Sequence, residues 1–81
     1  MASNIAEGQA RQHLGEFRQF LAMANGLLAE LDTQRIIAEE LHLIDQTRSM
    51  ELDNAITEIR KTLYALSAKA QAVNLKLKTD D

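Results

Sequence analysis

The apolar residues of this chain recur at alternating spacings of three and four residues, and no proline interrupts them. A first set consists of Leu14, Phe17, Leu21, Ala24, Leu28 and Leu31. A second set consists of Leu52, Ile56, Ile59, Leu63, Leu66, Ala70, Val73 and Leu77. Spacing of this kind places each set along one face of an α-helix, as in coiled coils and helical bundles. The sequence therefore predicts long amphipathic helices.

The first apolar set ends at Leu31, because the next position in its register is occupied by Arg35. Asp32 lies just after Leu31 and belongs to the residue types that cap the start of a helix. We therefore predict a turn at this point, with one helix over about 5–31 and a second over about 33–78.

Two other positions are candidates for a break in the helices. The two apolar sets differ in register, so the second helix is expected to kink or split at 45–49, where Thr47 or Ser49 could cap a new start. The pair Asn25-Gly26 is a weaker candidate, because the first set continues through it in phase.

Additional apolar residues lie beside these two sets. They make the apolar stripe of each helix wider than a pair of helices can cover. They are Phe20, Leu27, Ile36, Leu43 and Met50. A second molecule would cover them. We predict an all-α fold with a single helical domain over 1–81, in which an antiparallel helical hairpin pairs into a dimeric four-helix bundle. A monomeric three-helix bundle is the alternative.

Length and composition narrow the class of protein further. A chain of 81 residues buries a thin core, and without cysteine it has neither disulfides nor a Cys-based zinc site to stabilise it. Oligomerisation is the remaining source of stability. The net charge of -3 argues against nucleic acid as a partner. We see no secretory signal and no apolar run long enough for a membrane, so a cytoplasmic protein is expected.

The sequence shows no constellation that would support catalysis. Glu39 and His42 have the spacing of a Glu-x-x-His metal motif, but both project away from the predicted seam, whereas a metal site in a bundle lies inside it. No serine or cysteine has an obvious base beside it, and the three glycines are too scattered to bind phosphate. We expect no enzyme activity, no cofactor and no metal.

The expected function is therefore binding through helix faces. The candidate partner-binding residues are Phe20, Met23, Leu27, Ile36, Leu43 and Tyr64. We predict a small protein-protein interaction module, an adaptor, inhibitor or chaperone, whose partners are a second copy in a homodimer and a larger protein. A small dimeric DNA-binding regulator that uses the basic C-terminal helix is the alternative. No small-molecule substrate is expected.

Overall fold

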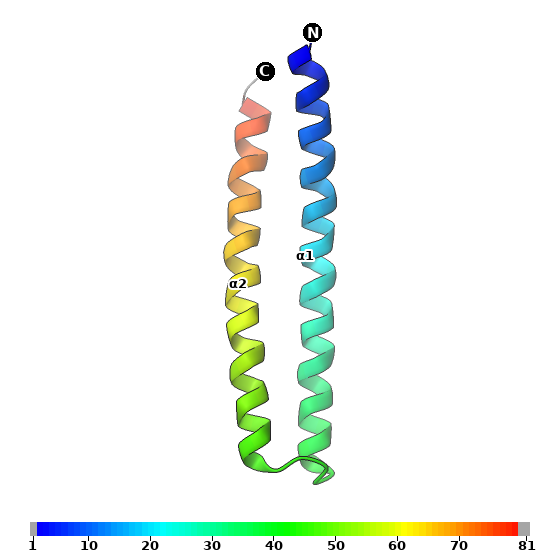
Figure 1. Ribbon diagram of the computed structural model, residues 1–81, viewed down its shortest axis with the longest axis vertical. Coiled ribbons are helices and arrows are strands. Elements are labelled where there is room, and N and C mark those ends of the chain that lie inside the picture. Colours follow the sequence, from blue (N-terminus) through cyan, green and yellow to red (C-terminus); the bar gives the residue numbers. More distant parts are fainter. Residues whose placement is uncertain (1, 80–81) are drawn as a thin grey trace.

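A computed structural model describes the backbone of residues 2–79 and the side chains of residues 4–78. It contains two helices, α1 (Ala2–Glu40) and α2 (Gln46–Thr79), which lie side by side and run in opposite directions (Figure 1). The rod measures 61 × 15 × 13 Å, and its radius of gyration is 18.3 Å. A compact domain of this length would have a radius of gyration of about 12 Å. The hairpin is thus too thin to enclose a conventional core.

The predicted all-α antiparallel hairpin is confirmed, whereas the alternative of three helices is wrong. The helix α2 runs from residue 46 to residue 79 without a break, and α1 passes through Asn25-Gly26 without one. The first helix also begins at Ala2 rather than near the predicted residue 5.

The predicted turn at 31–33 is wrong. The helix α1 continues through Asp32 and Arg35 to Glu40, and the chain reverses at 41–45 instead. Asp32 does not cap a helix because it lies inside α1. Its carboxylate accepts a hydrogen bond from Arg35 Nε at 3.1 Å. Arg35 stays in the seam because α2 supplies polar partners for it. The charge that suggested a break is therefore accommodated inside the hairpin.

The helix α1 ends in a Schellman motif, in which a left-handed residue turns the chain and the last carbonyls are satisfied by amides beyond the helix. His42 is the left-handed residue, with φ of 58°. The amide of Leu43 donates to the carbonyl of Ala38 at 2.8 Å, and the amide of His42 donates to that of Glu39 at 3.0 Å. The turn therefore lies where this local hydrogen bonding ends α1.

The helix α2 begins with an N-cap that lies before both of the residues considered from the sequence. The amide of Arg48 donates to Asp45 Oδ1 at 2.7 Å, the geometry of a capping aspartate. Asp45 rather than Thr47 or Ser49 thus defines the start of α2. The predicted break at 45–49 was close to the true turn, but the chain reverses just before it.

Replacing His42 with glycine should stabilise the protein by about 0.5–1 kcal/mol, because a side chain in the left-handed region is strained and glycine is not. Thermal unfolding followed by circular dichroism would measure the gain. The matched control is Glu40→Gly, which places glycine within the last turn of α1 and should lower stability by about the same amount. A His42→Gly variant that melts below the wild type would contradict this expectation.

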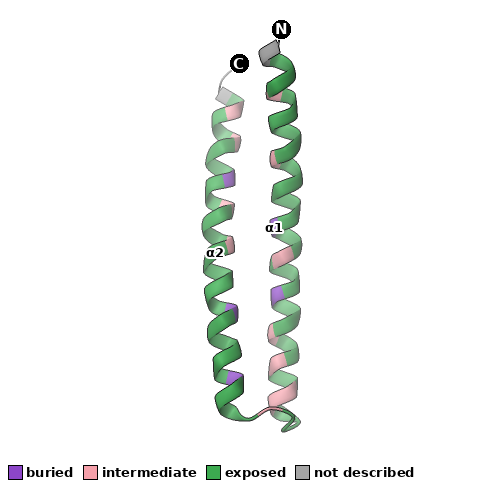
Figure 2. Ribbon diagram, viewed as in Figure 1, coloured by how far each residue is buried: buried purple, intermediate pink, exposed green. Residues whose placement is uncertain are grey.

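The core is a single seam between the helices, visible as the buried and half-buried positions on their facing sides (Figure 2). We call its members the seam residues. In α1 they are Leu14, Leu21, Leu28 and Arg35. In α2 they are Ser49, Ile56, Leu63, Ala70 and Leu77. Each series repeats every seven residues. Most flanking positions are exposed, and the half-buried ones carry small or polar side chains: Ala24, Asp32, Ala38 and Glu39 of α1 and Ser67 and Asn74 of α2.

Candidate functional site

One side of the hairpin is apolar along most of its length. Because the helices face each other and run in opposite directions, positions with the same offset from the seam fall on the same side of the pair. Positions three residues after a seam residue, and positions one residue before it, lie on one side. The large apolar residues there, which we call the apolar face, are Phe17, Phe20, Leu27 and Leu31 of α1 and Leu52, Ile59, Leu66 and Val73 of α2. All eight are exposed to solvent.

A shallow apolar groove follows this face near the turn. Its lining includes Leu31 and Ala38 of α1, Ile44 of the turn, and Leu52 and Ile56 of α2. These residues come from all three segments of the hairpin, so the groove exists only in the folded chain. It offers a concave place for apolar side chains of another molecule.

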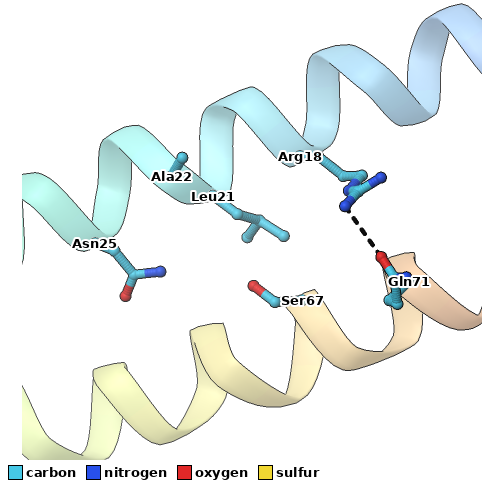
Figure 3. Close-up of a pocket in the computed structure, with 6 residues that line it drawn as sticks. All are labelled: Arg18, Leu21, Ala22, Asn25, Ser67 and Gln71. Atoms are coloured by element: carbon cyan, nitrogen blue, oxygen red, sulfur yellow. Dashed lines mark hydrogen bonds between the residues drawn. The ribbon is translucent and has the colours of Figure 1, made fainter.

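The opposite side of the hairpin is polar and carries hydrogen bonds between the helices. Arg18 Nη2 donates to Gln71 Oε1 at 3.0 Å across a shallow pocket that Asn25 and Ser67 also line (Figure 3). Nearer the termini, Arg11 Nη2 donates to the carbonyl of Leu77 at 2.8 Å. Arg18, Asn25 and Ser67 lie four positions after a seam residue, and Gln71 lies directly after one. The side opposite the apolar face is therefore the more polar of the two, although the side chains of Ile36, Met50 and Tyr64 are exposed on it.

A cluster of charged residues surrounds Arg35, whose side chain is only 14% exposed. Its Nη1 donates to the hydroxyl of Ser49 at 2.9 Å, and that hydroxyl donates to Glu39 Oε2 at 3.0 Å. Its Nη2 lies 3.0 Å from Asp32 Oδ1 and 3.7 Å from Asp53 Oδ1. Ser49 is 1% exposed, yet its hydroxyl is fully bonded. This arrangement satisfies a guanidinium at a seam position and holds the two helices in one register.

The solvent-accessible surface area of the hairpin is larger than that of a compact protein of the same mass. The chain exposes 6498 Å². A compact monomer of 9.1 kDa would expose about 4,900 Å². The excess of about 1,600 Å² exceeds the roughly 800 Å² that each partner buries in a typical specific interface. The thin core and this excess area both favour a state in solution in which another molecule covers part of the hairpin surface.

The candidate residues from the sequence do not all lie on one side. Phe20 and Leu27 belong to the apolar face, and Met23 borders it. Ile36 and Tyr64 follow a seam residue directly, which puts them on the other side of the rod, and Leu43 lies in the turn. Tyr64 is 78% exposed there. Sequence reasoning therefore identified one part of the face correctly and added residues that the fold places elsewhere.

Six of the eight residues of the apolar face were missed as candidate binding residues, because their periodic spacing assigned them to the buried seam. They are Phe17, Leu31, Leu52, Ile59, Leu66 and Val73. Alternating spacings of three and four describe two adjacent rows, and only one row in each helix is buried between α1 and α2. Both rows repeat every seven residues, so the spacing alone carried no signal that could have separated them.

These features define a class of small all-α protein, a two-helix hairpin that exposes a row of large apolar residues along one side. The chain belongs to the 23S rRNA-intervening sequence protein family, whose model matches residues 1–65. The match covers α1, the turn and more than half of α2. Comparison with curated proteins and with solved structures finds no match. Neither described helix is long and apolar enough to cross a membrane.

Proposed function

We propose that this protein is a non-enzymatic interaction module that acts through its apolar face, as an adaptor, inhibitor or chaperone in the cytoplasm. The observation that carries this proposal is the row of eight large, exposed apolar side chains contributed by both helices to one side of the rod. An apolar surface of this extent marks an interaction site in soluble proteins. A second hairpin would cover it in a dimeric four-helix bundle, and a helix of a larger protein fits the same surface.

The proposal predicts that binding depends on the apolar face and not on exposed apolar residues elsewhere. We expect Phe20→Gln combined with Leu27→Gln to abolish self-association and partner binding while helicity is retained, because both side chains are exposed in the hairpin. Light scattering at roughly tens of micromolar and partner capture by immobilised protein would measure the two effects.

The matched control for this experiment is Tyr64→Gln, which removes an equally exposed large side chain from the other side of the rod. We expect it to leave association unchanged. Equal behaviour of the Phe20/Leu27 variant and the wild type in both assays would contradict the proposed function.

A second candidate is a small dimeric regulator that binds DNA, or another nucleic acid, through the basic C-terminal helix. Lys69, Lys76 and Lys78 lie in the last third of α2, and the description of the family refers to 23S rRNA. Binding through phosphate contacts would weaken steeply as salt is added. Titrating duplex DNA and an rRNA fragment at two salt concentrations, with Lys69→Gln as the variant, tests this candidate.

A further inference from the structure

Charge is distributed unevenly along the chain. Residues 30–53, which include the last turns of α1, the turn and the first turns of α2, carry seven acidic and two basic side chains, a net charge of -5. The rest of the chain carries five acidic and seven basic side chains, a net charge of +2. We call residues 30–53 the turn end. Its charge attracts cationic molecules and repels nucleic acid and other anions.

The turn end also exposes large apolar residues that lie outside the apolar face. Ile36 and Met50 each follow a seam residue directly, which places them on the opposite side of the rod. They lie at the same level of the hairpin, because the residues before them, Arg35 and Ser49, are joined by a hydrogen bond of 2.9 Å. Met50 is 59% exposed and Ile36 is 47% exposed. The turn end therefore has a small apolar patch of its own.

This patch is not part of a longer apolar row. In α1 the residues with the same offset from the seam as Ile36 are Gly8, Gly15, Ala22 and Ala29. In α2 the residues with the same offset as Met50 are Thr57, Tyr64, Gln71 and Lys78. Apart from Tyr64, none of these is a large apolar residue. On this side of the rod, the apolar and the acidic side chains are thus concentrated at the same end.

A cleft between the two helices lies beside the apolar patch. Its lining consists of Arg35, Glu39, Gln46, Ser49, Met50 and Asp53. Asp53 Oδ1 lies 3.7 Å from Arg35 Nη2, and Glu39 Oε2 lies 3.8 Å from Arg35 Nη1, both beyond hydrogen-bond distance. The side chains of Glu39 and Asp53 are 39% and 51% exposed. Both carboxylates therefore retain the capacity to accept hydrogen bonds from another molecule.

The carboxylates at the cleft outnumber the cations. Arg35 forms ion pairs with Asp32, Glu39 and Asp53, so one positive charge serves three negative ones. A second cationic group between Glu39 and Asp53 would balance the excess. Within residues 4–78, no group of three acidic or histidine side chains is arranged to hold a metal ion. The exposed apolar side chains beside the cleft favour a cation carried by an apolar segment.

We propose that the turn end binds a basic amphipathic helix of another protein. A lysine or arginine of that helix enters the cleft between Glu39 and Asp53, and its apolar side chains cover Met50 and Ile36. A second copy of this chain is acidic overall, with a net charge of -3, so charge favours a different and basic partner. The surface is separate from the apolar face, and the inference goes beyond the proposed function.

A model ligand tests where the helix binds. The probe is an amphipathic peptide of about 14 residues, with leucine on one face and lysine on the other. Titrated into the isotope-labelled full chain, it should shift the NMR signals of the amides of Glu39, Gln46, Met50 and Asp53, which line the cleft. A peptide with glutamate in place of each lysine should leave these signals unchanged. Shifts confined to the apolar face would overturn the inference.

Substitutions at the turn end test the contacts. Glu39→Gln with Met50→Gln should raise the Kd of the peptide about tenfold or more, because one carboxylate and one apolar contact are lost. Ile36→Gln with Asp53→Asn should act in the same direction, and it leaves the bond between Ser49 and Glu39 in place. Fluorescence anisotropy of the labelled peptide gives the Kd, and circular dichroism verifies that each variant is helical.

The matched control is Glu58→Gln with Leu75→Gln, which removes one exposed carboxylate and one exposed apolar side chain from outside the turn end. It should change the Kd by less than about threefold. The Phe20/Leu27 variant should also bind the peptide to within about threefold, because both of its substitutions lie on the apolar face. Loss of peptide binding in this variant alone would place the peptide on that face and would contradict the inference.

The outcomes separate this inference from the proposed function. A wild-type chain that does not bind the peptide, or turn-end variants that bind it as tightly as the wild type, would overturn the inference alone. Turn-end variants that lose self-association in light scattering but keep the peptide would make a second copy the occupant, which also overturns it. Failure of the proposed function would instead appear as unchanged self-association and partner capture by the Phe20/Leu27 variant.

Discussion

Replacing Ile56 with alanine is expected to lower the free energy of unfolding by about 2–5 kcal/mol. Ile56 is 2% exposed and is one of only four apolar side chains that are buried within the described part of the chain. With so few buried contacts, a cavity at this position removes a large fraction of the total stability. Urea denaturation followed by circular dichroism, at one fixed protein concentration, would measure the loss.

The matched control for Ile56 is Leu75, which is exposed and lies on the outer side of α2. Leu75→Ala removes a similar volume without opening a cavity, so we expect a loss of less than about 0.5 kcal/mol. Comparable losses in the two variants would mean that the seam does not hold the hairpin together.

Replacing Arg35 with alanine is expected to cost about 2–3 kcal/mol. The change leaves the carboxylates of Asp32, Glu39 and Asp53 close together without their common cation, and it removes a bond to the buried hydroxyl of Ser49. Loss of one partner from a fully buried ion pair costs about 3–5 kcal/mol, and the partial exposure of the carboxylates lowers that figure here. Urea denaturation gives the measurement.

Two comparisons separate charge from packing at Arg35. Adding Asp53→Asn to Arg35→Ala should recover part of the loss, because it removes one of the repelling charges. Arg18→Ala, which removes an exposed arginine bonded to Gln71, should cost less than about 1 kcal/mol. A loss at Arg35 no larger than that at Arg18, or no recovery in the double variant, would contradict the role assigned to this cluster.

The position of the turn could not be predicted from the sequence because two of its determinants are not visible in a pattern of apolar residues. Arg35 was taken as the end of the seam, since a charged residue at a buried position is costly when it stands alone. Ser49 and Asp53 make it acceptable, but they are fourteen and eighteen residues away and reach it only after the chain has folded back. His42 occupies a left-handed position that is usually glycine.

The candidate binding residues were only partly predictable for a related reason. The spacing of Leu52, Ile59, Leu66 and Val73 is compatible with the seam and with the row beside it. Which row is buried depends on the crossing and register of the two helices, and the bonds of Arg18 and Arg35 to α2 report that register. Tyr64 was also predicted to bind a partner, yet it lies on the side away from these rows.

The sequence by itself determined that the chain is helical, that its two long helices pair antiparallel, and that it carries more apolar surface than the pair can bury. These properties follow from the periodicity and the number of apolar residues, which are local quantities. Only the tertiary structure decided where the chain reverses and which side of the hairpin is apolar. Both depend on contacts between residues distant in sequence, above all the partners that α2 supplies to Arg35, and on the register in which those contacts hold the helices.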